Sequence, residues 1–201
     1  MKSWGALCVW ASTAFVATAG CAAAQTDDSM LDELNFARTH PYDYARELRR
    51  EASSNAQGER VPGLEFESRA AITDTIDFLS QQPPLQPLSQ DATLTAVAQA
   101  YVIRQGPTGE VGHVGPSGES LGERLKSQGS RFATAGETIA YGEVSAHDAV
   151  RQLIIDSNVP DRGHRKIIFD ASFTAAGASC GPHRVYRTMC VIDFGGSRLS
   201  Q

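Results

Sequence analysis

The sequence of 201 residues predicts an α+β fold. Stretches with helical hydrophobic spacing come first, and runs rich in β-branched and aromatic residues are concentrated towards the C-terminus. Proline and glycine residues separate these stretches. A chain whose helices precede its strands is expected to pack those helices on a small, mostly antiparallel sheet.

The chain opens with a segment typical of a secretion signal. Lys2 supplies a positive charge, the apolar run Ala6–Ala19 carries no charge, and small residues follow it. Because this run is too short to span a bilayer, we predict a signal peptide over residues 1–24, cleaved within Ala22–Ala24. The alternative is a bacterial lipobox ending at Cys21, which would anchor the protein to a membrane as a lipoprotein.

The part that remains after cleavage suits one domain. Removal of residues 1–24 leaves about 177 residues, enough for a hydrophobic core. Residues 25–29 are expected to form a flexible N-terminus and residues 30–201 the domain. The net charge is −5, and −6 once Lys2 leaves with the signal. Because this balance is acidic and no basic stripe occurs, nucleic acid is not expected as a partner.

Six stretches follow the spacing of amphipathic helices. The first is expected to begin at Met30, and the others to cover residues 42–51, 69–81, 92–105, 119–128 and 146–157. Pro41 interrupts the first before the pattern resumes at Tyr42, and Asp91 can cap the helix that follows it. Ser145 and Asp148 have the spacing of a capping box. Loops are expected at 52–65, 106–118 and 158–163.

The expected strands cover residues 136–142, 173–180 and 185–194. The last two read as a hairpin that turns at Gly181-Pro182. Cys180 and Cys190 would then lie on partner strands. They are the two cysteines left after cleavage at Ala24, and an oxidising compartment favours one disulfide between them. Two free, buried thiols are the alternative.

Four side chains are the candidates for a binding or catalytic site. His113 and His164 lie in glycine-bearing loops, where backbone segments can approach closely and side chains can converge. Glu137 stands at the head of an expected strand, and Asp156 flanks the buried stripe of the 146–157 helix. The other histidines are expected to be structural or exposed; they are His40, His147 and His183.

These residue types suit a metal site. Neutral imidazoles bind Zn²⁺, and carboxylates orient them or complete the coordination shell. Two histidines make an incomplete site, so His113 and His164 should hold a divalent metal weakly and in a pH-sensitive way. The same groups could act as acid and base, but no hydrolase motif is visible and no catalytic residue is assigned. A third interpretation is a hydrogen-bonded network that fixes the loops to the core.

Two arginines are candidates for a role beyond surface charge. They are Arg124 and Arg165, and an exposed surface arginine is the alternative. For Arg165 the expected partners are Asp156 and Asp161, which would hold the loop that carries His164.

The order of the sequence motifs resembles the CAP superfamily. This superfamily comprises the cysteine-rich secretory, antigen 5 and pathogenesis-related 1 proteins, whose domain is also called SCP-like. The motifs are Gly112-His113, Gly-Glu-x-Ile-Ala at 136–140, Arg-Gly-His-Arg at 162–165 and Cys-Val-Ile-Asp-Phe-Gly at 190–195. The segment 34–45 also resembles the first helix of the family. The resemblance covers about residues 30–196 and is closest to the bacterial branch.

The resemblance implies a three-layer α-β-α sandwich with a central cleft. Two histidines and two acids converge there, and in some members the histidines hold a divalent metal. His113 and His164 match the histidines, Glu137 matches the first acid, and the position of the second is taken by Asp156, a shorter side chain. The sequence departs from the family at two neighbouring positions: Leu153 replaces a frequent tryptophan, and Thr138 replaces the asparagine that usually follows the first acid.

Function follows less firmly from the resemblance, because the family shares a fold more reliably than an activity. The expected function is that of a secreted or periplasmic binding module whose ligand is a divalent metal, a lipid or a peptide-like molecule. The alternatives are a metal-dependent hydrolase or peptidase that uses the histidines and acids, and an inert structural protein of the envelope.

Overall fold

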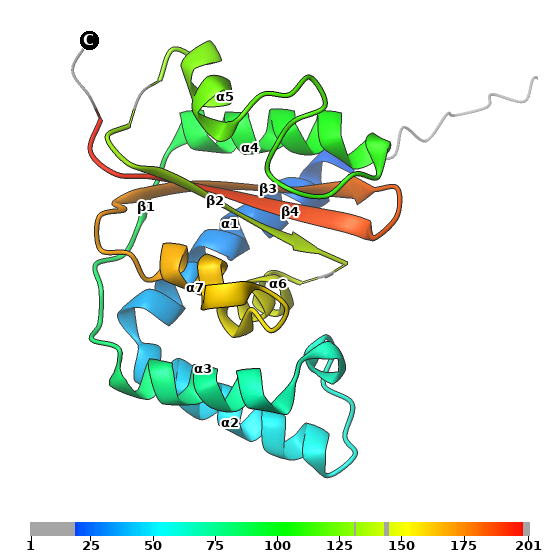
Figure 1. Cartoon of the computed structure of the whole chain (residues 1–201), viewed down its shortest axis with the longest axis vertical. Helices are drawn as coiled ribbons and strands as arrows, with labels where there is room; N and C mark the ends of the chain where they lie inside the picture. The colour runs from blue at the N-terminus through cyan, green and yellow to red at the C-terminus, as the bar shows by residue number, and fades with distance from the viewer. Residues whose placement is uncertain (1–18, 131, 143–144, 199–201) are drawn as a thin grey trace, which may run out of the picture.

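A computed structural model describes residues 19–130, 132–142 and 145–198 (Figure 1). Its helices are α1 (Ala19–Thr39), α2 (Pro41–Ala56), α3 (Arg69–Gln81), α4 (Ala92–Gln105), α5 (Leu121–Ser127), α6 (Ala146–Ile155) and α7 (Gly163–Ile168). Its strands are β1 (Ser89–Gln90), β2 (Ala135–Tyr141), β3 (Ala175–His183) and β4 (Arg187–Gly195). Single 3₁₀ turns occupy Leu64–Phe66, Gly106–Thr108 and Pro160–Arg162. The predicted signal peptide falls largely on residues 1–18, outside the described residues.

The strands form one sheet in the order β1-β3-β4-β2. β4 pairs antiparallel with both β2 and β3, and only the short β1 is parallel to its neighbour β3. Helices α4 and α5 cover one face of this sheet, and α1, α6 and α7 cover the other (Figure 1). The predicted α+β class and three-layer α-β-α sandwich are therefore confirmed, with α2 and α3 packed as a further pair beyond α6.

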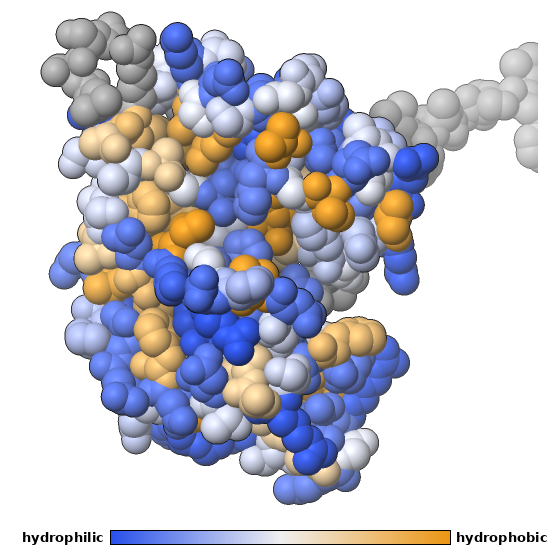
Figure 2. Space-filling view, in the orientation of Figure 1, coloured by the Kyte–Doolittle hydropathy of each residue, from blue (hydrophilic) through white to orange (hydrophobic). Residues whose placement is uncertain are grey.

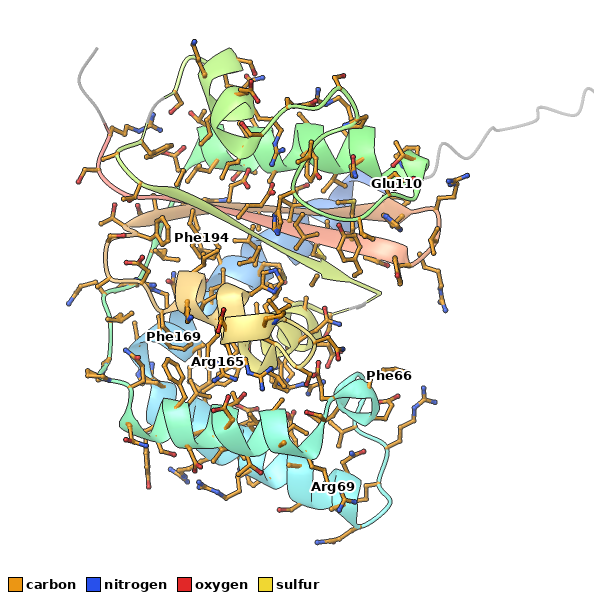
Figure 3. The ribbon with its side chains drawn as sticks, viewed as in Figure 1. Phe66, Arg69, Glu110, Arg165, Phe169 and Phe194 are labelled. Carbon is orange, nitrogen blue, oxygen red and sulfur yellow. A yellow bond between two sulfur atoms is a disulfide. The ribbon has the colours of Figure 1, made fainter. Side chains whose placement is uncertain are left out.

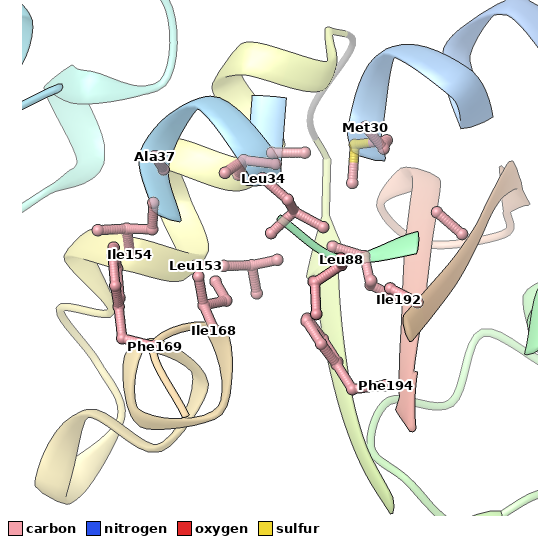
Figure 4. Packing of buried hydrophobic residues seen from close by; sticks show 14 of the residues in the cluster. Met30, Leu34, Ala37, Leu88, Leu153, Ile154, Ile168, Phe169, Ile192 and Phe194 are labelled. Atoms are coloured by element: carbon pink, nitrogen blue, oxygen red, sulfur yellow. The ribbon is translucent and has the colours of Figure 1, made fainter. Parts of the chain in front are cut away.

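The main hydrophobic core lies between the sheet and the helices α1, α6 and α7 (Figure 4). Leu34 from α1 and Leu153 from α6 pack there with Ile192 and Phe194 from β4, and all four are buried. Their spacing in the sequence is the helical spacing in α1 and α6 and the alternation of a strand in β4, so each element buries one face. This packing fixes α6, and the candidate site residue Asp156 directly follows the last residue of this helix.

On the opposite face, α4 lies unusually close to β3. A Cβ atom on Gly177 would stand 2.1 Å from the backbone nitrogen of Thr95 and 2.5 Å from the carbonyl carbon of Leu94. Only glycine fits at this contact. Tyr101 and Val102, further along α4, are buried against Met189 and the rest of the sheet. This packing fixes the C-terminal half of α4, from which the loop to α5 begins.

The predicted disulfide is present, and the hairpin turns later than expected. Cys180 and Cys190 are direct partners in the β3–β4 ladder and are bonded to each other. Gly181-Pro182, expected to form the turn, continues β3 and pairs with Met189 and Thr188. Pro182 is tolerated in this strand because β1 pairs with β3 only at its beginning, so the proline nitrogen lies on an open edge.

Several helix boundaries differ from the expectation. α1 begins at Ala19 and runs through residues 25–29, which were expected to be flexible. α2 continues through residues 52–56, and the expected loop at 158–163 leads into α7, whose first turn contains His164. β1 was not predicted, because two residues leave no periodic pattern. Among the described residues, no helix is both long enough and apolar enough to cross a bilayer.

The capping prediction at α6 is half correct. The Ser145 hydroxyl accepts a hydrogen bond from the backbone nitrogen of Asp148 at 3.0 Å, as an N-cap should. The Asp148 carboxylate, however, accepts from the Ser145 hydroxyl and from Arg151 at 2.8 Å. A complete capping box forms instead at the start of α5.

Candidate functional site

His113 is carried by the loop between α4 and α5, which two tyrosines hold. The Tyr101 hydroxyl donates to the carbonyl oxygen of Gly112 at 2.6 Å. The Tyr141 hydroxyl accepts from the nitrogen of the same glycine at 3.0 Å. Gly112 has a φ of 110°, a conformation that favours glycine. The loop is therefore fixed one residue before His113, whose side chain is 52% exposed.

Glu137 orients the His113 ring and is itself held by Arg124. Nδ1 of His113 lies 2.9 Å from Oε1 of Glu137, and the other carboxylate oxygen accepts from the Arg124 guanidinium. Arg124 also donates to the His113 carbonyl oxygen at 2.9 Å and lies 4.0 Å above the Tyr101 ring. The Arg124 and Glu137 side chains are only 2% and 3% exposed, so this is a buried, desolvated ion pair.

Asp156 orients the second histidine in the same way. Its Oδ1 lies 2.8 Å from Nδ1 of His164, and its Oδ2 accepts from the His164 backbone nitrogen at 2.9 Å. Asp156 is not inside the helix as expected: it follows the last residue of α6 with a φ of 56°, in the left-handed region. Aspartate tolerates this conformation. The turn brings the short carboxylate to the first turn of α7, which a helical position would not do.

Arg165 is buried and anchors α7, but its partners differ from the two expected. Its guanidinium donates to Asp74 on α3 at 2.9 Å, to the Ile154 carbonyl oxygen at 2.6 Å and to the Thr75 hydroxyl at 2.5 Å. Neither Asp156 nor Asp161 forms an ion pair with it. Figure 3 shows Arg165 between α7 and α3. Arg165 therefore supports the segment that carries His164 from behind.

The structure thus brings all four candidate residues together as two histidine–carboxylate pairs. The His113 and His164 ring centroids are 6.1 Å apart and the rings are tilted by 49°. A carboxylate accepts hydrogen bonds, so each Nδ1 carries a proton, and the neutral tautomer that this contact selects has its lone pair on Nε2. Neither Nε2 forms a hydrogen bond within the described part of the chain. Two nitrogen ligands are available beside β2, the edge strand of the sheet that carries Glu137.

A pocket of about 170 Å³ adjoins His164. Its walls are formed by residues from the 64–68 segment, β2, α6 and the turn after α6; they include Phe66, Glu67, Ile139, Leu153, Asp156 and Val159. Burial raises the pKa of the Glu67 carboxyl. The molecular surface is hollowed between the α4–α5 side and the α2–α3 side, with exposed apolar side chains on both rims (Figure 2).

One site residue was not predicted. Asp193 on β4 lies directly opposite Glu137 in the β2–β4 ladder, is fully buried, and has no hydrogen-bond partner for either carboxylate oxygen among the described residues. Burial, and then the charge of Glu137, raise the pKa of Asp193 well above its ordinary value. A charged residue inside the apolar run at 190–194 was the available signal. Asp193 is therefore a buried carboxyl beside the Glu137–Arg124 pair whose environment favours its protonated form.

The remaining histidines divide into two kinds. His183 is buried and structural as expected, because its Nε2 lies 3.1 Å from the Glu110 carbonyl oxygen and its Nδ1 accepts from the backbone. His40 is exposed. His147, also expected to be structural or exposed, is half-buried and belongs to a group with Glu47 and Glu51 that could hold a metal ion.

Three relatives are similar to parts of this chain. Protein YkwD of Bacillus subtilis (strain 168) is 32% identical over 97 residues, which cover 48% of this chain and 36% of that protein. A solved extracellular protein containing an SCP domain, from Bacillus anthracis strain Ames, is 25% identical with a TM-score of 0.48, over 56% of this chain and 35% of its own. A solved outer surface protein from Borrelia burgdorferi is 22% identical with a TM-score of 0.47, over 57% of this chain and 80% of its own.

The matched part therefore spans little more than a third of the two Bacillus proteins. The match to a family model is more extensive. The model described as the cysteine-rich secretory protein family, CAP, matches residues 31–194, a range that includes both histidine–carboxylate pairs. The chain belongs to the CAP family of cysteine-rich secretory proteins.

Proposed function

We propose that this chain is a secreted binding domain whose central cleft holds a divalent metal ion of the zinc class between His113 and His164. The observation that carries the proposal is the pair of buried carboxylates on the two Nδ1 atoms. Such carboxylate–histidine pairs fix the tautomer, orient the ring and increase the basicity of the ligand nitrogen. Both Nε2 atoms are thereby prepared as ligands.

The carboxylates themselves act as orienting groups in this proposal. Glu137 is engaged by Arg124 and His113, and Asp156 by two nitrogens of His164. Neither has a free oxygen facing outwards in the way a metal ligand needs. A zinc ion with two protein ligands keeps two of its four positions open. The ion would therefore bind weakly alone and more tightly together with a ligand that supplies oxygen donors.

A peptide-like ligand fits these surroundings better than a lipid. The pocket beside His164 has a volume of about 170 Å³, below the roughly 300 Å³ at which pockets for whole small molecules begin. It can receive one side chain but not an acyl chain. Phe66 and Val114, both exposed, offer further apolar contact for an extended segment. A carboxylate or carbonyl oxygen of such a segment could complete the coordination of the ion.

A metal-dependent hydrolase is the alternative, and the cleft favours it less. A metal-bound water can attack a peptide bond when a general base takes its proton. Glu137 and Asp156 are the acids nearest the histidines, and both are already occupied by hydrogen bonds. Turnover of peptide or ester substrates that a chelator abolishes and that His113→Ala/His164→Ala lacks would overturn the binding role in favour of hydrolysis.

Secretion belongs to the same proposal. The signal-like segment, the Cys180–Cys190 disulfide and the family all support an oxidising destination outside the cytoplasm. We propose release after cleavage within Ala22–Ala24. The mass of the protein recovered from its native host tests this step: a lipid-modified Cys21 at the new N-terminus would contradict it.

Calorimetric titration of the mature protein with Zn²⁺ tests the metal site. We expect His113→Ala/His164→Ala to lose one bound ion per chain, and His40→Ala, which removes an exposed histidine outside the cleft, to lose none. Equal zinc binding by the protein and the double variant would refute coordination in the cleft.

A further inference from the structure

Two helices bring a second group of metal-binding side chains together, away from the cleft. Glu47 and Glu51 lie one turn apart on α2, and His147 lies in the first turn of α6. One ligand atom from each of these residues lies within 4.8 Å of the others. In a tetrahedral zinc site with bonds of about 2.1 Å, ligand atoms are about 3.4 Å apart. Small side-chain adjustments would therefore complete a site here.

The orientation of the His147 ring matches that of a metal ligand. Its Nδ1 lies 2.9 Å from Oε1 of Glu33 on α1, and its Nε2 lies 3.0 Å from Oε1 of Glu51. Glu33 thus stands where the orienting carboxylate of a carboxylate–histidine–metal triad stands. Nε2 points towards Glu51 of α2, and an ion bound there would take the place of the proton now shared with Glu51.

The charge around His147 is strongly negative. The network contains four carboxylates, those of Glu33, Glu47, Glu51 and Asp148. Arg151 is the only arginine or lysine that the described residues place in it. Its guanidinium lies 3.0 Å from Glu51 and 2.8 Å from Asp148. The Glu47 side chain has no ion pair or hydrogen bond in the described part of the chain. Even with His147 protonated, carboxylates outnumber cations. A divalent cation would correct this imbalance.

A buried hydroxyl beside the group points independently to a missing ligand. Tyr44 is 1% exposed, and its hydroxyl faces Glu33 without a well-formed hydrogen bond to any of the described residues. Its ring lies 6.2 Å from the His147 ring, and after burial the charge of Glu33 is the main influence that raises its pKa. Buried hydroxyls are nearly always paired with protein or ordered water. A water bound to an ion at this position would supply the partner.

We propose that Glu47, Glu51 and Nε2 of His147 form a second divalent-cation site of the zinc class, oriented by Glu33. A mixed nitrogen and carboxylate set suits zinc and similar transition metals, whereas magnesium and calcium prefer oxygen ligands alone. The fourth position is left to water. Because its ligands come from α2 and α6, the ion would tie the α2–α3 pair to the sandwich and act as a structural metal, independently of the cleft.

Co²⁺ is the probe for this site, used on the mature protein with His113→Ala/His164→Ala so that the cleft does not contribute. We expect one bound Co²⁺ per chain, with the visible absorption of a four- or five-coordinate ion. Glu47→Gln should weaken binding by at least about tenfold, and Glu33→Gln by about 10- to 100-fold. Asp43→Asn, which removes an exposed carboxylate one turn earlier on α2, should leave it unchanged.

Glu47→Gln is the decisive variant, because Glu47 has no ion pair to lose among the described residues and the fold should survive the change. Circular dichroism on each variant checks that it does. No Co²⁺ bound in the cleft-free background would overturn the proposal, as would equal binding by Glu47→Gln and Asp43→Asn. Failure of the cleft site leaves this result unaffected, since the two sites share no residue.

Discussion

The buried Arg124–Glu137 pair gives the sharpest prediction about the cleft. Arg124→Met removes the cation from a carboxylate that is 3% exposed and that also lies beside buried Asp193. Removal of one partner from a buried ion pair costs about 3–5 kcal/mol, because the other charge is left without compensation. In a domain of this size, 1 kcal/mol shifts Tm by about 2–4 °C. We therefore expect Tm to fall by roughly 6 °C or more.

The double variant Arg124→Met/Glu137→Gln is the matched control. The glutamine keeps an oxygen that accepts from Nδ1 of His113, but no buried charge remains without a partner. Replacement of a whole buried pair by neutral side chains is often close to neutral, so the double variant should recover most of the lost stability. Urea unfolding of the two single variants and the double variant measures the coupling.

Two results would refute this reasoning. A loss below about 1 kcal/mol for Arg124→Met would mean that solvent reaches Glu137 and compensates its charge. Additive losses in the double variant would mean that the two side chains do not act as a pair. In either case Glu137 could not be held rigidly enough to orient His113.

Three further predictions concern the frame of the site. Gly177→Ala should destabilise the protein by at least about 1–3 kcal/mol in urea, because its Cβ would lie 2.1 Å from the Thr95 backbone nitrogen; an unchanged midpoint would show that α4 can move away. The raised pKa of Asp193 contributes stability below about pH 4 that is lost as pH rises through the folded pKa, so the stability of Asp193→Asn should gain on that of the parent as pH rises above about 4; a constant difference would contradict this. Reduction of Cys180–Cys190, or its replacement by serines, should cost about 2–4 kcal/mol, less where the strands alone keep their register; no change in Tm with dithiothreitol would contradict this.

The fold could be predicted from the sequence wherever one element buries one face. Apolar residues at helical spacing and a proline stop placed α3 at its observed bounds, and Asp91 caps α4 as predicted. Elements without periodicity were missed or shifted. β1 is too short to leave a pattern, and the hairpin turn moved because Gly181-Pro182 could be accommodated at an open strand edge.

The candidate site was predictable in its members and less so in its geometry. His113, Glu137, Asp156 and His164 do come together, but the sequence could not show that Asp156 leaves the helix in a left-handed conformation. Hydrogen bonds between residues far apart in the chain leave no pattern in the local sequence. Arg165 is 91 residues from its partner Asp74, and Glu33 is 114 residues from His147.

We propose that one divalent ion binds between the two cleft histidines, His113 and His164. Crystals of the mature protein soaked in Zn²⁺ and measured at the zinc absorption edge test it directly. We expect an anomalous peak within about 2.1 Å of Nε2 of both His113 and His164, with each Nδ1 still bonded to its carboxylate. Ordered histidine rings with no peak between them, or a peak at Nδ1, would contradict it.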